Sequence, residues 1–172
     1  AERVAFVLHD VFGVPFEEIA TIVERSPVAA KKLASRARAR VQGTSTRPTA
    51  DLARDREVVE RFLAAARAGD LSGLLAVLAP DVVRRADRAA LRPDVPTELR
   101  GARTVAEETV ANAARARFAR PILVNGKLGA VVAPRGRLVL VLDLTLEGDR
   151  VAAIDVIAEP KRLQELALAI AP

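Results

Sequence analysis

FEEIATIVERSPVAAKKLASRARARV, residues 16–41, predicts two helices joined by a tight turn and followed by a basic tail. Ser26 can cap the second helix with its hydroxyl, and Pro27 suits the first helical position, where its missing N–H is not needed. The first helix, residues 16–23, can pack its apolar side chains on the second across a turn of about three residues, which is helix-turn-helix spacing. This stretch therefore predicts a small helical unit with a break before Pro27.

The second predicted helix has one apolar and one basic face. Small and apolar residues recur about every 100° around the helix, and this predicts a buried face made of Ala30, Leu33, Ala34, Ala37 and Val41. The residues that project away from it are Lys31, Lys32, Ser35, Arg36 and Arg40, with Arg38 at the margin. Such a helix can enter a DNA major groove.

A run of charges can also be nothing more than a solvated helix face. Here, residues 25–50 hold no acidic residue and seven cations. The basic helix also follows another helix at helix-turn-helix spacing. This context favours DNA contact over a solvated face.

Three features of residues 1–41 resemble region 4 of bacterial RNA polymerase sigma factors of the extracytoplasmic-function type: EEIA at 17–20, the turn at Ser26, and SRARARV at 35–41. AERVAFVLHDVFG, residues 1–13, matches as the preceding helix. EEIA alone also fits helix-turn-helix regulators of the LuxR kind, but the arginine-rich exit from the second helix favours sigma. One departure is Pro15, where such sequences often place a capping serine.

The resemblance implies that the second helix reads the promoter −35 element and that the unit docks on the β-subunit flap of core RNA polymerase. Carried over by position, it makes Ser26, Lys31, Lys32, Ser35 and Arg36 the DNA-facing candidates, and Arg38 and Arg40 extend that basic surface. Because the chain begins abruptly within a helical pattern, we expect upstream sequence to be missing. By the resemblance, that sequence would include sigma region 2.

Composition bounds the rest of the chain. A chain of 172 residues is long enough for one large or two small domains, and an apolar content of 51% is ample for a core. Because the chain has five Phe and no Trp or Tyr, we predict a core built from Ala, Val and Leu. The chain has no cysteine, which excludes disulfides and thiolate metal sites. His9 is its single histidine, and one histidine without cysteines is too few ligands for a zinc cluster. We expect no cofactor and no metal. With no signal-peptide pattern and no apolar run near 18 residues, the sequence predicts a cytoplasmic protein without a membrane partner.

A polar stretch, QGTSTRPTAD at residues 42–51, has the chemistry of a linker. We therefore predict a helix-turn-helix domain at 1–41, a linker at 42–51 and a second domain at 52–172. The second domain is expected to contain helices at 52–68, 70–79 and 102–118, a strand at 81–87, and a terminal helix at 163–170. Asn125-Gly126 and Gly148-Asp149 predict hairpin turns within an antiparallel meander.

This order of elements, with AARAGDLSGLLAVLAPDVV at 65–83 and VNGKLG at 124–129, resembles the SnoaL-like, nuclear-transport-factor-like cone. The resemblance implies an α+β fold in which a curved antiparallel sheet wraps on helices around a pocket. A sigma region 4 followed by such a domain resembles a group of sigma factors in which the extension acts as a built-in regulator. A glycine-rich DGGG-type motif of that group is replaced here by ADRAAL, residues 86–91.

Enzymes on this fold need an acid or base in the pocket. The candidate pocket residues are Arg85, Asn125, Asp143 and Asp155, with Thr145 as a further helper. The alternation along the strand around Asp143 places the leucines 138–146 on one face, which is the better core, and Asp143 on the other. The preferred interpretation is therefore a sigma factor with a non-catalytic regulatory domain. The alternatives are a ligand-responsive LuxR-type regulator and a SnoaL-like cyclase or isomerase.

Overall fold

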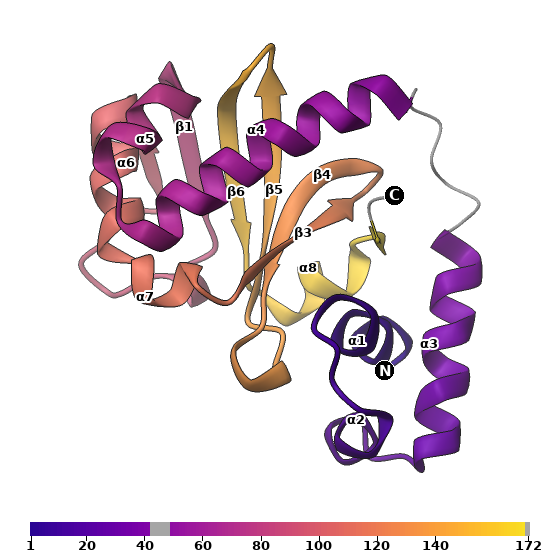
Figure 1. The fold of residues 1–172 in the computed structure, drawn as a ribbon. Helices are drawn as coiled ribbons and strands as arrows, with labels where there is room; N and C mark the ends of the chain where they lie inside the picture. Colours follow the sequence, from indigo (N-terminus) through magenta and orange to yellow (C-terminus); the bar gives the residue numbers. More distant parts are fainter. Residues whose placement is uncertain (42–48, 171–172) are drawn as a thin grey trace.

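The computed structural model describes residues 1–41 and 49–170, apart from the side chains of Arg3 and of residues 38–41 and 49–50. The chain begins with a unit of short helices, here called the helical unit. Its elements are α1 (Glu2–Phe6), a π-helical turn η1 (Val7–Val11), α2 (Phe16–Ile22) and α3 (Pro27–Val41). Figure 1 shows α3 as the outermost of these helices, with α1 between it and the strands.

The predicted cap of α3 is confirmed. The Ala29 N–H donates to Ser26 Oγ at 3.2 Å, and Pro27 is the first helical residue. Gly13 ends the first helical segment in the left-handed region at φ 66°, as a helix-terminating glycine does. Pro15 precedes α2 without a side-chain cap, as its departure from the sigma pattern indicated.

The remainder of the chain, here called the cone, is a sheet with several helices on one face and a short C-terminal helix toward the other. Its helical elements are α4 (Thr49–Ala68), α5 (Leu71–Val77), η2 (Arg88–Ala90), α6 (Ala102–Ala111), α7 (Ala113–Ala116), η3 (Pro134–Gly136) and α8 (Pro160–Glu165). Its strands are β1 (Leu78–Ala86), β2 (Glu98–Arg100), β3 (Ala119–Val124), β4 (Lys127–Val132), β5 (Leu140–Glu147), β6 (Arg150–Ile157) and β7 (Leu168–Ala169). The strands form one sheet in the order β2-β1-β6-β5-β4-β3-β7.

The predicted fold class is confirmed, with one difference in strand direction. The meander β3 to β6 is antiparallel, and its turns fall at Asn125-Gly126 and Gly148-Asp149 as predicted. However, β1 pairs with β6 in parallel, so the sheet is mixed rather than wholly antiparallel. No hairpin connects these two strands, and the whole segment between them lets β6 return beside β1 in the same direction.

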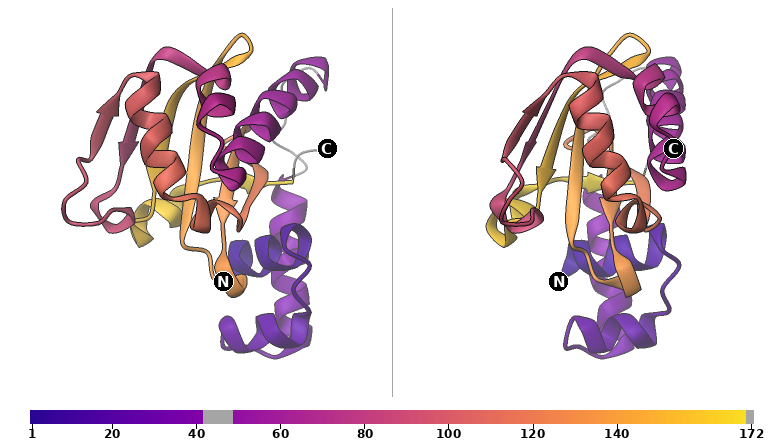
Figure 2. Two further views of the ribbon diagram at one scale, coloured as in Figure 1. Left: turned by 60° about the vertical axis from the view of Figure 1, so that its left-hand side comes forward. Right: turned by 90° about the vertical axis from the view of Figure 1, so that its left-hand side faces the viewer.

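Two apolar clusters lie on opposite faces of the sheet. On the inner face, leucines of β5 pack with α4 residues such as Phe62 and Leu63, so the predicted leucine core is confirmed for the strand itself. On the outer face, Val141 and Ile157 pack with the helical unit. Leu138 departs from the prediction and belongs to the outer cluster, because it precedes β5 and escapes the strand's alternation. Figure 2 shows the helical unit lying at one end of the cone.

The prediction of a terminal helix is wrong in its bounds. The helix expected at 163–170 is instead α8, which ends at Glu165, followed by strand β7 paired with β3. Local periodicity favoured a helix, but the open edge of β3 offers hydrogen bonds that an extended segment satisfies. The helix predicted at 102–118 is divided into α6 and α7 around Asn112.

The predicted linker at 42–51 lies outside the described residues for most of its length, and α4 begins at Thr49. Within the described part of the chain, no helix is both long enough and apolar enough to cross a membrane.

Candidate functional site

The described cations of α3, Lys31, Lys32 and Arg36, face solvent in the folded chain. Five of the seven candidate DNA-binding residues have exposed side chains: Ser26, Lys31, Lys32, Ser35 and Arg36. The other two, Arg38 and Arg40, lie in α3, but their side chains are outside the described part. The guanidinium of Arg36 lies 4.0 Å from the carboxylate of Glu2, and the Arg36 side chain is 67% exposed. An exposed ion pair of this length is weak, so Arg36 remains accessible to another anion.

The turn before α3 sets the direction of the basic face. Glu24 takes the left-handed conformation at φ 52°, and the Arg25 N–H reaches back to the carbonyl of Ala20 at 2.9 Å. The opposite face of α3 is held by burial, because Ala30 and Ala34 are fully enclosed. The small side chains let α3 approach its neighbours closely, and this packing leaves Lys31, Lys32 and Arg36 on the outward surface.

His9 has a structural position. Its Nδ1 lies 3.1 Å from the carbonyl oxygen of Val14, and its ring stacks on Phe16 with the centroids 3.9 Å apart. These contacts join η1 to α2. His9, which is half-buried, thus has a structural role in the helical unit.

The helical unit is packed directly on the cone. One continuous buried cluster contains Phe6, Leu8 and Ile19 from the helices and Ile122, Val131, Val141, Ile157, Leu166 and Leu168 from the cone. The loop between β4 and β5 also reaches the helices: a Cβ on Gly136 would lie 3.5 Å from Val14 and 3.6 Å from Leu8. Burying apolar surface on both sides favours this docked arrangement. Within it, the basic face of α3 stays exposed.

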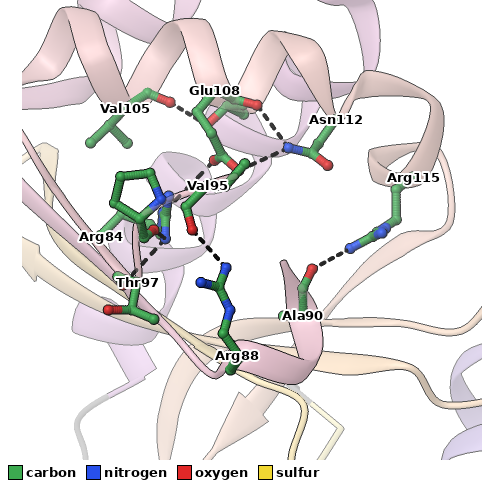
Figure 3. A network of polar contacts seen from close by, with 11 residues as sticks. Arg84, Arg88, Ala90, Val95, Thr97, Val105, Glu108, Asn112 and Arg115 are labelled. Carbon is green, nitrogen blue, oxygen red and sulfur yellow. Dashed lines mark hydrogen bonds and ion pairs between the residues drawn. The ribbon is translucent and has the colours of Figure 1, made fainter. Parts of the chain in front are cut away.

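The cone also contains a partly open cavity of about 100 Å³ between the sheet and helices α4, α6 and α7. Its wall is mainly apolar and includes Phe62, Leu63, Leu140, Leu142 and Ile154. The polar residues at the wall are Arg84, Glu108, Thr109, Asn112 and Arg115. Figure 3 shows the strand residue Arg84 pointing toward Glu108, and Arg115 bonded to the carbonyl of Ala90.

The four candidate pocket residues do not line this cavity. Arg85, Asp143 and Asp155 lie on the outer face of the sheet, because Arg85 pairs with Asp155 and Asp155 with Asp143 across adjacent strands. Asn125 lies in the β3–β4 turn, where its Oδ1 accepts the Ala167 N–H at 2.9 Å. The neighbour of Arg85 faces inward instead: Arg84 pairs with Ile154, whose side chain belongs to the inner core. Alternation along β1 could have shown this, because Arg84 shares a face with Val82.

Asp143 and Asp155 are directly opposite each other on β5 and β6. Burial raises the pKa of Asp143 above its usual value. The charge of the nearby Lys127 ammonium lowers this pKa in part, and the charge of the Asp155 carboxylate raises it further. Arg85 is instead bonded to Glu98, with Nε donating to Oε2 at 3.1 Å. The hydrogen bond from Arg100, together with the charges of Arg100 and Arg85, holds the pKa of Glu98 below its usual range.

The segment ADRAAL contains an anchoring carboxylate, that of the half-buried Asp87. Its Oδ2 accepts the N–H groups of Ala158 and Glu159 at 2.9 and 3.0 Å, and its Oδ1 pairs with Arg162. Burial alone would raise the pKa of Asp87, but these bonds outweigh it and hold the pKa below its usual range. Asp87 therefore ties the loop after β1 to the start of α8.

Residues 1–41 match the family model for sigma-70, region 4. The chain is 35% identical over 174 residues to the ECF RNA polymerase sigma factor SigJ of Mycobacterium tuberculosis (strain ATCC 25618 / H37Rv), covering 94% of this chain and 56% of SigJ. It is 32% identical over 177 residues to the probable ECF RNA polymerase sigma factor SigI of M. tuberculosis (strain CDC 1551 / Oshkosh), covering 96% of this chain and 56% of SigI.

Among solved structures, the crystal structure of M. tuberculosis SigJ superposes with a TM-score of 0.53 at 34% identity, covering 94% of this chain and 59% of that chain. This match extends through both the helical unit and the cone. The chain spans about half the length of the curated relatives it matches.

Proposed function

Since this chain carries a sigma-70 region 4 domain and is related along nearly all of its length to extracytoplasmic-function sigma factors, we propose that it is the C-terminal part of an alternative sigma factor. Residues 1–41 recognise the promoter −35 element and dock on the β-flap of core RNA polymerase. The domain predicted at 52–172, which makes up nearly all of the cone, modulates that activity without catalysing a reaction. The working partners are thus promoter DNA and the polymerase, and a region 2 upstream completes the factor.

The observation that carries this proposal is the exposed basic face of α3. Lys31, Lys32 and Arg36 project from a helix whose start is capped by Ser26 and whose other face is buried. A helix held in this way after a helix-turn-helix break has the geometry that enters a major groove. Its cations meet phosphates, whereas Ser35 can hydrogen-bond a base edge.

The apolar contact between the helical unit and the cone supports modulation. Because the two share one buried cluster, we expect a change at the outer-face residues of that cluster to alter how the helical unit is held. The basic face is exposed in the docked state, so the cone acts through the position of region 4 and the access of the polymerase, rather than by covering the DNA-binding residues.

The proposal is tested with fluorescence anisotropy, using duplexes selected from a random pool for binding to the chain. Lys31→Ala and Arg36→Ala should each weaken binding several-fold, because each removes a cation at the phosphates. Each should also lower the slope of log affinity against log salt by about one. Lys161→Ala, an exposed lysine of α8, is the matched control and should leave binding unchanged. Salt-insensitive binding, or equal effects of all three variants, would contradict the proposed surface.

Polymerase docking is tested separately by capturing purified core RNA polymerase with the whole chain. Retention of the polymerase, competed by excess β-flap fragment, is the expected result. Binding to palindromic DNA as a dimer with no retention of the polymerase would favour the LuxR-type regulator instead.

A further inference from the structure

Arg84 is the one buried charged residue among those that the structure describes. It lies in the middle of β1, on the strand face that looks into the cone, and its side chain is only 3% exposed. Its guanidinium is at the wall of the cavity beneath α6 (Figure 3). Burying a permanent charge in an apolar interior is costly unless the charge is paired and its hydrogen bonds are made.

The hydrogen bonds of Arg84 use only one of its three guanidinium nitrogens. Nη1 donates to the carbonyl oxygens of Pro96 and Thr97 at 3.0 and 3.3 Å. Nε and Nη2 are both buried and have no hydrogen-bond partner. These two nitrogens share one edge of the planar group, and that edge can hold a carboxylate through two parallel hydrogen bonds.

Glu108 does not fill that edge. Its Oε2 is 3.8 Å from Arg84 Nε, which is too long for a hydrogen bond, while its Oε1 accepts from Asn112 Nδ2 at 2.9 Å. A second cation, Arg115, also lines the cavity. With two arginines and one glutamate, the charged groups at the cavity wall carry a net positive charge that favours an anion.

The rest of the cavity wall is mainly apolar and therefore favours a ligand with an apolar body. Phe62, Leu63, Leu142 and Ile154 surround the space next to the guanidinium. Largely apolar cavities with a few convergent polar groups are where proteins bind small organic molecules. We propose that the cone binds a small organic carboxylate with an apolar body, its carboxylate on the Nε–Nη2 edge of Arg84. This assignment goes beyond the role in transcription initiation and does not depend on it.

The test uses 2-naphthoate as the probe and its neutral counterpart 2-naphthamide as the matched control. The chain has no Trp and no Tyr, so naphthyl fluorescence can be followed without emission from either. The unmodified chain should bind 2-naphthoate about tenfold or more tightly than the amide, because only the acid pairs with the buried guanidinium. Equal affinities, or no binding of the acid at millimolar concentration, would overturn the proposal.

Three variants locate the site. Arg84→Met should abolish the preference for the acid, whereas Arg85→Met changes the adjacent arginine on the outer face and should leave binding unchanged. Glu108→Gln removes the competing carboxylate, keeps an acceptor for Asn112, and should tighten binding of 2-naphthoate. If Arg84→Met does not fold, the acid-amide comparison and Glu108→Gln still decide. Weaker or unchanged binding in Glu108→Gln, or loss of binding in Arg85→Met, would contradict the assigned site.

Discussion

At the scale of single residues, Asp87 shows how one carboxylate joins distant parts of the chain. Because its pKa is lower in the folded state than in the unfolded chain, its ionised form stabilises the fold. This contribution is fully present above the unfolded-state pKa of about 3.9 and is lost as the pH falls through the lower folded-state pKa. The bonds to Ala158, Glu159 and Arg162 are its physical source.

Asp87→Asn should therefore lower the free energy of unfolding by about 1–2 kcal/mol at neutral pH. It removes the negative charge of the carboxylate that accepts hydrogen bonds from Arg162 and from the two N–H groups. The difference from the unmodified chain should shrink as the pH drops below about 4. Urea unfolding at a series of pH values measures both. Asp94→Asn, at a side chain that is 78% exposed, should change little. A loss for Asp87→Asn that stays constant into acid would refute this account.

At the scale of elements, the β3–β4 turn holds the last strand in place. Asn125 and Gly126 have φ values of 50° and 80°, the left-handed pair that a tight hairpin turn requires. The Asn125 N–H donates to the Ala167 carbonyl at 2.7 Å, while its side chain accepts the Ala167 N–H. Ala167, the residue just before strand β7, is thus bonded to the turn through both its N–H and its carbonyl.

Substitutions at Asn125 distinguish the effect of its backbone conformation from that of its side-chain hydrogen bond to Ala167. Asn125→Gly keeps the left-handed conformation but loses the side-chain bond, and should cost about 1 kcal/mol of stability. Asn125→Ala should cost more because it adds backbone strain. Asn125→Asp keeps both features and serves as the control. Hydrogen exchange at the Ala167 amide should accelerate in the Gly and Ala variants alone. Unchanged exchange in both variants would contradict the role of the Asn125 side chain in holding Ala167.

At the scale of the whole molecule, the apolar contact between the helical unit and the cone is the feature most open to test. Leu138 lies in the connection between β4 and β5, is partly buried, and packs against the outer cluster. Leu138→Asp places a carboxylate at that contact without altering the inner core, and the cost of desolvating a charge should release the helical unit.

Hydrogen exchange across the whole chain measures this release. Residues 4–8, which are buried or half-buried in the docked state, should exchange faster in Leu138→Asp, whereas exchange in β5 and β6 should not change. Arg137→Asp adds the same carboxylate at an exposed neighbouring position and should leave exchange unchanged. Uniform acceleration over all strands would mean that the variant disrupts the cone itself, and unchanged exchange at residues 4–8 would mean that Leu138 does not support docking.

The sequence by itself determined the features that depend on residues close together in the chain. Ser26 and Pro27 place the start of α3, because a cap and a proline act within one helical turn. Asn125-Gly126 places a hairpin for a similar reason, since its backbone conformation suits the tight turn. Alternation along β5 identified the leucine face as core, because successive side chains of a strand point to opposite sides.

Only the tertiary structure decided the features that depend on distant partners. The parallel pairing of β1 and β6 and the change of residues 168–169 from helix to strand follow from which edges are available in the assembled sheet. The inward position of Arg84, in place of Arg85, follows from the register of β1 against β6. Docking of the helical unit on the outer face joins apolar residues from opposite ends of the chain. Local patterns show that such residues are apolar or charged, but the neighbours that bury or pair them are set by the fold as a whole.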